Sequence, residues 1–226
     1  MAAKTQRTER RTDALSRERI VETAIEILDA GGERALTVRA LTARLATGSG
    51  AIYWHVGGKD ELLAAAANGI IARVMTEVNR DAQPRETIRA VALGVFNAIE
   101  AHPWVGTQLH REPWQSAMLQ IFEGIGGPLQ ALGAPEAAQL DCGFVLVNYV
   151  LGVAGQHAAN ARLVEPGTDR ATYLAGVAAR WAQLDPTQYP FVRQVAAQVP
   201  EHDDREQFLT GIDLILAGIR TEFELT

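Results

Sequence analysis

Residues 37–59 read TVRALTARLATGSGAIYWHVGGK. The pattern predicts a short helix, a glycine-bearing turn, a second short helix, and a turn that begins a third. Helices this short cannot bury a core of their own, so they must pack on a larger body. Two such helices joined by a tight turn form a helix-turn-helix. The second helix carries Tyr53, Trp54 and His55 in a row, and three bulky side chains in succession cannot all face inward. The segment therefore predicts a surface that contacts another molecule.

The residues on both sides of this segment predict an all-α chain of nine or ten helices. Ser16 is a suitable N-cap for a helix that Gly31 and Gly32 end, and Thr37 caps the next one. No strand pair or hairpin signal is present. We expect the remaining helices at about 49–55, 59–80, 85–101, 114–132 (interrupted by Gly124, Gly126, Gly127 and Pro128), 136–163, 169–183 and 203–224. A broken segment at 103–114 and a loop with Pro186 and Pro190 separate some of them.

Length and composition predict a small domain joined to a larger one. The 226 residues are 47% hydrophobic and 21% charged, as in ordinary soluble globular proteins. We expect a disordered basic arm at 1–15, a helix-turn-helix domain at 16–62 and a ligand-binding and dimerisation domain at 63–226. Arg7, Arg10 and Arg11 of the arm either contact DNA or belong to a leftover of the start site or of cloning.

The charge of the chain is divided unevenly. The formal net charge is −6, but residues 1–62 contain ten Lys/Arg and nine Asp/Glu, whereas residues 63–226 contain eleven and eighteen. Six basic and three acidic residues fall within residues 1–19. The basic end therefore coincides with the helix-turn-helix, which suits contact with phosphates.

The sequence lacks the signals of secreted proteins, membrane proteins and several classes of enzyme. The single cysteine, Cys142, excludes an internal disulfide and favours a reducing, cytoplasmic compartment. The polar N-terminus does not resemble a signal peptide, and no apolar run approaches the roughly 18 residues of a membrane helix. A Gly-rich phosphate loop, a paired metal-binding His motif and a useful Cys/His pair are all missing from the sequence. We therefore expect no catalytic residue, no metal and no cofactor.

The run LTVRALTARLATGSGAIYWHVGGKDELL resembles the TetR family of bacterial transcriptional regulators. Its most specific part is Tyr-x-His-Val followed by Lys-Asp-Glu-Leu-Leu. The resemblance covers residues 16–70 and implies a homodimeric repressor that binds a palindromic operator in double-stranded DNA. It also implies release of the DNA when a small ligand binds.

The resemblance assigns the DNA contacts to the helix at 49–55 and its surroundings. Tyr53 and His55 would contact phosphates or bases, and Trp54 would pack on the sugar-phosphate backbone. The small residues at the start of that helix permit close approach to a groove. The predicted DNA-binding residues are Thr37, Arg39, Ser49, Gly50, Ala51, Tyr53, Trp54, His55 and Lys59.

Two alternatives and one departure apply to these assignments. Tyr53 and Trp54 could be core aromatics, although Ile52 and Val56 already fill the inward i, i+4 pair. Arg39 could be a solvated surface residue. The turn ATGSG lacks the branched apolar residue usual in the family, so specificity would depend on Ser49, Tyr53 and Arg39 or on DNA shape.

The C-terminal part resembles the subgroup that contains the tetracycline repressor, through NYVLGVAGQHAA and REQFLTGIDLILAGIR. This resemblance implies a dimeric four-helix bundle formed by the helices at 136–163 and 203–224. Independently, the apolar face of the last helix needs a large partner surface, and small residues at 152–158 permit close approach. The alternative is an intramolecular core.

A small hydrophobic ligand is expected in the region of residues 96–149, where aromatic residues are dense. His102, His110, Asn148 and His157 are possible polar anchors, and Tyr149 is a further aromatic. No histidine aligns with the metal-drug site of the tetracycline repressor, whereas a planar or polycyclic ligand is compatible. The alternative is that the aromatics fill the core. The predicted ligand-binding residues are Phe96, Trp104, His110, Trp114, Met118, Phe122, Phe144 and Asn148.

Two other functions remain open at this point. One is a helical small-molecule-binding or enzymatic protein that uses the helix-turn-helix only as a scaffold. The other is an architectural DNA-binding protein that responds to no ligand.

Overall fold

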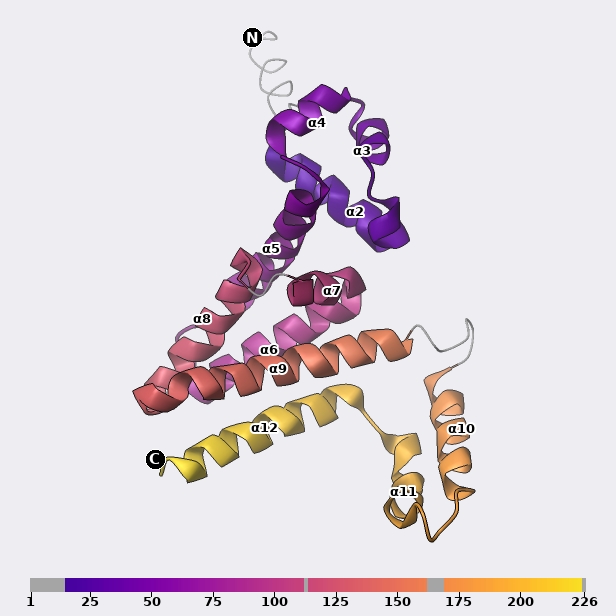
Figure 1. The fold of residues 1–226 in the computed structure, drawn as a ribbon. Coiled ribbons are helices and arrows are strands. Elements are labelled where there is room, and N and C mark those ends of the chain that lie inside the picture. Colours follow the sequence, from indigo (N-terminus) through magenta and orange to yellow (C-terminus); the bar gives the residue numbers. More distant parts are fainter. Residues whose placement is uncertain (1–14, 112–113, 162–168, 225–226) are drawn as a thin grey trace, which may run out of the picture.

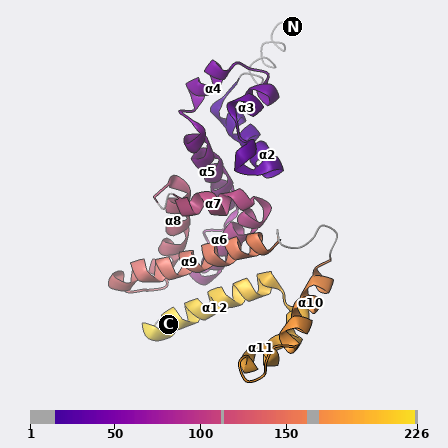
Figure 2. The same ribbon diagram turned by 45° about the vertical axis from the view of Figure 1, so that its right-hand side comes forward.

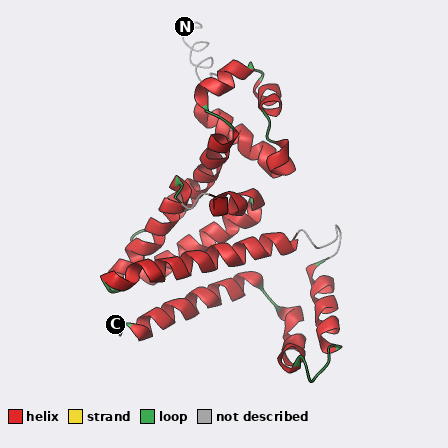
Figure 3. Cartoon of the chain, viewed as in Figure 1, coloured by secondary structure: helices red, strands yellow, loops and turns green. Residues whose placement is uncertain are grey.

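The computed structural model describes residues 15–111, 114–161 and 169–224 (Figure 1). Every regular element among these residues is helical, which confirms the all-α class (Figure 3). The predicted arm at 1–15 lies almost wholly outside the described residues. The elements are α2 (Arg17–Ala35), α3 (Val38–Leu45), α4 (Ser49–His55), α5 (Lys59–Glu77), α6 (Pro84–Ala101), α7 (Pro103–Arg111), α8 (Ser116–Ala131), α9 (Glu136–Ala161), α10 (Arg170–Ala182), α11 (Pro190–Val195), the 3₁₀ helix η1 (Ala196–Glu201) and α12 (Asp204–Glu222).

Three proline-containing segments differ from expectation. The segment at 103–111 is the helix α7 rather than a break, and α11 begins within the predicted loop. Pro103 and Pro190 each occupy the first position of their helix, where the missing N–H costs nothing. Pro128 lies inside α8 and does not end it. The described residues therefore contain eleven α-helices, one or two more than the sequence predicted.

Helices α2, α3 and α4 form the compact group at one end of the molecule, at the top of Figure 1. The Oγ of Ser16 accepts a hydrogen bond from the N–H of Arg19 at 3.2 Å and caps α2. Gly32 has a φ of 66°, a left-handed conformation that interrupts the helix where the sequence predicted its end. Helix α2 packs against both α3 and α5, and its buried face includes Ile20 and Leu28.

Helix α5 connects this group to the rest of the chain. It packs on α2 near its start and on α6, α7 and α8 further along (Figure 1). Its buried residues run from Leu62 to Met75, and they belong to one continuous apolar core that extends from Ile20 of α2 to Leu216 of α12. The predicted domain boundary between residues 62 and 63 falls in the first turn of α5 and stays a prediction.

The C-terminal part is built around α9, which packs against α6, α7, α8 and α12 (Figure 2). Among the described residues, α9 is the one helix long and apolar enough to cross a membrane by length and composition. The expectation that no apolar run approaches that length was therefore wrong. Its packing partners show that α9 is the core helix of a folded domain. Only 39% of its apolar window is buried, so part of an apolar face is uncovered in the single chain.

Helices α10 and α11 and the 3₁₀ helix η1 pack mainly on one another. They stand beside the ends of α9 and α12, at the lower right of Figure 1. This small unit and the two long helices together enclose the cleft described below.

Candidate functional site

Helix α4 presents its aromatic residues to solvent because one apolar residue anchors it. Ile52 is 1% exposed and is the only buried residue of α4, and Val56 directly after the helix is also buried. In contrast, Tyr53 is 57% exposed and Trp54 is 85% exposed. The alternative that these aromatics belong to the core is therefore excluded. His55 is half-buried.

The N-terminus of α4 is formed by small residues. Ser49 and Gly50 are exposed and Ala51 is half-buried, with Gly48 as an N-cap that supplies no side-chain hydrogen bond. The first N–H groups of this helix thus have no side-chain partner from the cap, and such groups suit a phosphate. The left-handed residue of the preceding turn is Ala46, with a φ of 49°, rather than a glycine.

Thr37 and Arg39 lie at the start of α3. The Oγ1 of Thr37 accepts a hydrogen bond from the N–H of Ala40 at 3.1 Å and fixes the first turn. Arg39 is exposed, and its guanidinium makes no ion pair or hydrogen bond with any residue that the structure describes. Two nearby arginines do have carboxylate partners: Arg17 pairs with Glu61, and Arg44 pairs with Glu26. Arg39 is thus a cation available to a partner.

Unlike Arg39, Lys59 already has partners within the protein. Its ammonium donates to the carbonyl oxygen of Glu33 at 2.8 Å, across from the end of α2. The side-chain carboxylate of Glu33 lies 3.9 Å from the Lys59 ammonium and accepts a hydrogen bond from Arg111 of α7 at 2.7 Å, which lowers the pKa of Glu33. A phosphate would have to compete with the carbonyl for Lys59, so its DNA contact stays a prediction.

A glutamate fixes the turn that joins α4 to α5. The Oε2 of Glu61 accepts from the N–H of Gly57 at 2.8 Å, and its Oε1 accepts from Arg17 of α2 at 3.1 Å. These two contacts, the backbone N–H first, hold the pKa of Glu61 below its usual value. Glu61 thus links the turn after α4 to the start of α2.

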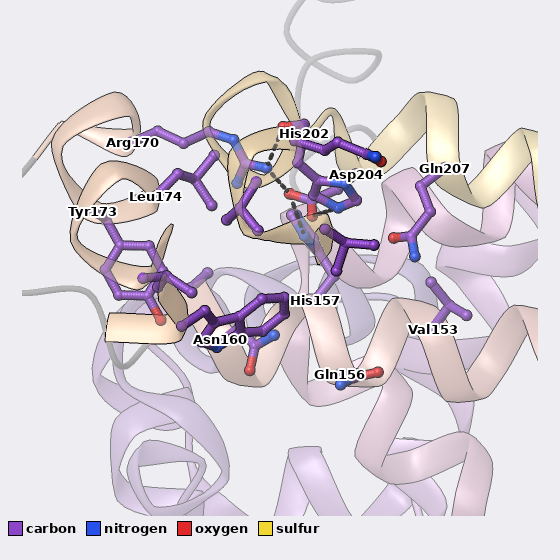
Figure 4. Close-up of a pocket in the computed structure, with 16 residues that line it drawn as sticks. Val153, Gln156, His157, Asn160, Arg170, Tyr173, Leu174, His202, Asp204 and Gln207 are labelled. Carbon is purple, nitrogen blue, oxygen red and sulfur yellow. Dashed lines mark hydrogen bonds and ion pairs between the residues drawn. The ribbon is translucent and has the colours of Figure 1, made fainter. Parts of the chain in front are cut away.

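A cleft of about 680 Å³ lies between the C-terminal half of α9, α10, η1 and the start of α12 (Figure 4). One side carries an ionic group centred on Asp204, whose Oδ2 is 2.7 Å from Nη2 of Arg170 and 3.2 Å from Nδ1 of His157. The Nε2 of His202 lies 3.2 Å from the Oδ1 of Asp204. The other ring nitrogen of His157 lies 3.0 Å from the Oε1 of Glu100 on α6. Four helices therefore meet at this group.

A second cavity of about 380 Å³ lies between α5, α6 and α8. Met75 and Val91 contribute apolar walls, and Arg80 and Glu123 contribute charge.

Two buried amide oxygens outside both cavities, those of Asn97 on α6 and Gln115 before α8, have no hydrogen-bond partner among the described residues. Unsatisfied buried amides are uncommon in folded interiors and therefore need a reason.

The structure does not bring the predicted ligand-binding residues together around either cavity. Phe96 is core, 4.7 Å between ring centroids from Phe208, and Met118 is also buried. Trp104 is buried and donates from Nε1 to Asp29 of α2 at 2.8 Å, whereas Trp114 is 74% exposed.

The rest of the set is scattered as well. Phe122 and Phe144 form an edge-to-face pair with centroids 5.0 Å apart. His110 is bonded to the carbonyl of Gly106, and Asn148 is exposed. Of the polar anchors considered from the sequence, His157 lines the cleft and His102 pairs with Asp29. The set stays a prediction. The residues of α10 and η1 that line the cleft, such as Val177, Trp181 and Val199, were missed by the sequence analysis.

Large apolar side chains are exposed on α9 and α12, the two helices predicted to dimerise. Leu140 and Val145 on α9 are exposed, and Leu214 on α12 is 68% exposed. The two helices also pack on each other, where Tyr149 stacks on Phe208. Each helix thus has one face in the core and one uncovered apolar face.

Comparison with known families and structures identifies the chain. The family described as "Bacterial regulatory proteins, tetR family" matches residues 20–66, and "Tetracyclin repressor-like, C-terminal domain" matches residues 79–223. The chain belongs to the TetR family. The first match contains α3, α4 and most of α2, and the second contains α6 to α12.

Related proteins agree with this TetR-family membership. An HTH-type transcriptional regulator from Saccharopolyspora erythraea is 30% identical over 155 residues, which is 68% of this chain and 66% of that protein. The structure of SCO7222, a TetR from Streptomyces coelicolor, has 50% identity and a TM-score of 0.85 and covers 92% of this chain and 99% of that one. The Streptomyces coelicolor protein ActR in complex with actinorhodin has 25% identity and a TM-score of 0.74, covering 92% and 98%.

The function predicted from the sequence, a ligand-responsive transcriptional regulator of the TetR family, is confirmed at this level. The names of the relatives describe regulators of transcription rather than enzymes. Family members bind DNA operators and small ligands, and they are typically dimers.

Proposed function

We propose that this TetR-family regulator represses transcription by binding a palindromic operator as a homodimer, and that a small, largely apolar ligand releases it. The observation that carries the DNA-binding role is helix α4, which is anchored by Ile52 and presents Tyr53 and Trp54 to solvent. A helix exposed in this way fits a major groove. Residues 16–62 act as the DNA-binding domain and residues 63–226 as the ligand-binding and dimerisation domain.

Charge supports the same assignment. Most cations around α3 and α4 have carboxylate partners, but Arg39 has none among the described residues. An exposed, unpaired guanidinium at the start of a helix beside α4 is placed to contact a flanking phosphate. Ser49 and Gly50 allow the backbone at the start of α4 to approach a second phosphate.

The uncovered apolar faces of α9 and α12 support the homodimer. Leu140, Val145 and Leu214 are large apolar residues left in water by the single chain. A two-fold axis between two copies would pair these faces with themselves and form a four-helix bundle. The same axis would place the two α4 helices on successive turns of one DNA duplex, which is why a palindrome is expected.

Two features support a ligand in the C-terminal part. Cavities of about 680 and 380 Å³ fall in the size range of small-molecule sites, which is roughly 300–1,000 Å³. The similar protein ActR was solved with actinorhodin, a precedent for a ligand in this fold.

Selection of DNA duplexes from a random pool, followed by titration of a labelled winner, tests the operator role. Wild-type protein should select a palindrome and bind it less tightly as salt rises, because phosphate contacts release counterions. Tyr53→Ala should weaken binding by roughly 1–3 kcal/mol if the ring reaches bases or phosphates. Arg39→Ala should weaken binding to all sequences and reduce the salt dependence by about one counterion.

Tyr189→Ala is the matched control, since Tyr189 is an exposed tyrosine in the loop before α11, far along the chain from α4. It should leave the affinity unchanged. Sedimentation equilibrium of the wild type should give twice the chain mass of 24.5 kDa. If the wild type selects no sequence and its binding ignores salt, the proposal is wrong.

A further inference from the structure

A groove lies where the end of α2 meets α5 and α7, at the junction between the helix-turn-helix and the rest of the chain (Figure 1). It consists of two adjoining cavities of about 500 and 470 Å³, which share the lining residues 31–33. Each cavity is large enough for a small molecule. Of the eight ligand-binding residues expected from the sequence, Trp104 is the one that lines this groove. The groove is therefore separate from the cavities described above.

The order of residues along two of the helices gives the groove a direction. On α7, Trp104, Gln108 and Arg111 are spaced by four and three residues and so lie on one face. Leu63 and Lys59 are likewise one turn apart on α5. Trp104, Gln108 and Leu63 line the first cavity, whereas Arg111 and Lys59 line the second. The groove thus runs from an apolar end to a basic end, over roughly 10 Å of helix rise along α7.

The apolar end combines buried walls with one amide that has nothing to bind. Leu28, Leu63 and Trp104 are buried side chains that line it. Gln108, one turn after Trp104, is only 5% exposed, and its side-chain amide makes no hydrogen bond with a residue in the described ranges. A buried amide without a partner costs free energy, and a ligand oxygen in the cavity would supply the missing hydrogen bond.

The basic end has one cation that is not paired within the protein. Four charged side chains line this cavity, three of them cations and one the carboxylate of Glu33. Glu33 accepts a hydrogen bond from Arg111 at 2.7 Å and lies 3.9 Å from Lys59. The third cation, Arg34, is exposed and makes no ion pair or hydrogen bond with any described residue. At the apolar end the Asp29 carboxylate already accepts an indole N–H at 2.8 Å. The excess of cations attracts an anion to the basic end, where Arg34 is available to pair with it.

From these features we propose that the groove binds a small aromatic anion, a flat apolar ring system that carries one carboxylate. The rings pack on Leu28, Leu63 and Trp104. The amide of Gln108 donates a hydrogen bond to an oxygen of the ligand, and the guanidinium of Arg34 pairs with its charge. The site takes residues from both halves of the chain, and its existence does not depend on the proposed function.

Calorimetric titration of the full chain with 2-naphthoate, in the absence of DNA, tests the site. This probe has two fused rings and one carboxylate. 2-Naphthamide has the same shape without the charge, and 2-(aminomethyl)naphthalene carries the opposite charge. Naphthoate should bind at least about threefold more tightly than the amide, because its charge has a partner at the basic end, and the amine should bind most weakly. Absence of naphthoate binding at millimolar concentration, or tighter binding of the amine, would overturn the proposal.

Two matched arginine substitutions locate the carboxylate. Arg34→Gln should weaken naphthoate binding about 2- to 5-fold, the range of an exposed ion pair, and should leave the affinity for 2-naphthamide unchanged. Arg220→Gln is the control, because Arg220 is also exposed, lies in the last turn of its helix and has no partner in the described part of the chain. It should change neither affinity. Equal effects of the two substitutions on naphthoate would refute the pairing with Arg34.

Two further substitutions test the amide and the cavity. Gln108→Leu should weaken the binding of naphthoate and of naphthamide about 3- to 10-fold, the effect of one neutral hydrogen bond. Because the amide has no partner among the described residues, this variant should resist urea at least as well as the wild type, and a marked loss of stability would refute the free amide. Thr107→Trp fills the first cavity from an exposed position and should abolish binding, whereas Gln130→Leu, at an exposed position of α8, should not change it. If Gln108→Leu and Thr107→Trp bind naphthoate as the wild type does, the ligand lies elsewhere and the proposal is wrong.

Discussion

Gly211 on α12 faces the ring of Tyr149 on α9, and its replacement by alanine is expected to weaken the contact between these two helices. A methyl group at this position would overlap the hydroxyl oxygen and Cζ of Tyr149 and lie 2.9 Å from Cε2. The ring has little freedom to move aside. It stacks on Phe208 with centroids 5.7 Å apart and planes at 13°, and its hydroxyl donates to the Phe208 carbonyl at 3.2 Å.

The magnitude follows from what the ring would lose. The aromatic pair and the hydrogen bond each contribute about 0.5–1.5 kcal/mol. Crowding of neighbouring side chains adds about 1 kcal/mol or more, whereas alanine in place of glycine inside a helix gains about 1 kcal/mol. Gly211→Ala should therefore lower the free energy of unfolding by about 2 kcal/mol. Urea unfolding followed by circular dichroism, at one fixed protein concentration, measures it.

Two variants decide whether the Tyr149 ring is the cause. Gly176→Ala changes a glycine inside α10 where an added methyl group would lie within 4 Å of no atom beyond its own stretch of helix, so the change should be neutral or stabilising by up to about 1 kcal/mol. Combining Gly211→Ala with Tyr149→Ala removes the overlap and should show a favourable coupling of about 1 kcal/mol or more. Tyr149→Phe should rescue less, since Cζ and Cε2 remain. If Gly211→Ala is as stable as Gly176→Ala, the reasoning fails.

Two further predictions concern single titratable groups. Hydrogen bonds from Arg89, and to a lesser extent from Arg85, hold the pKa of Asp213 below its ordinary value of 3.8. The ion pair therefore stabilises the folded protein fully above pH 3.8, and this contribution is lost as the pH falls through the lower pKa of the folded state. The stability difference between wild type and Asp213→Asn in urea unfolding should therefore shrink as the solution is acidified, and a constant difference would contradict the ion-pair origin. Burial, helped by the charge of Asp141, raises the pKa of the Cys142 thiol, so a thiol reagent at neutral pH should react at least about tenfold more slowly with the native protein than with the unfolded chain. Similar rates in both states would show that Cys142 is accessible.

The helix-turn-helix could be predicted closely because local interactions determine it. Ser16 and Thr37 cap their helices through contacts three residues away, and such caps can be recognised in a sequence. Helix α4 has the bounds expected for it, 49–55, because Ile52 and Val56 are spaced to face inward. The exposure of Tyr53 and Trp54 follows from the same spacing.

Long-range contacts limited the prediction elsewhere. Trp104 had been expected at a ligand, but its indole N–H binds Asp29, 75 residues earlier in the chain. Lys59 had been expected to be free for a phosphate, but it binds the carbonyl of Glu33. These partners lie 75 and 26 residues away in the sequence. Helix and turn patterns repeat within a few residues, so they do not indicate such contacts.

By itself the sequence determined the all-helical class, the position of the DNA-reading helix and the TetR-family membership, because caps, turns and apolar periodicity act within a few residues. The tertiary structure alone decided which side chains share a cavity. The cleft collects residues from α9, α10, α11, η1 and α12, which span positions 153 to 207, and its ionic group adds Glu100 of α6. Such a site exists only after helices distant in sequence have packed, because each helix contributes one face and the packing selects which faces meet.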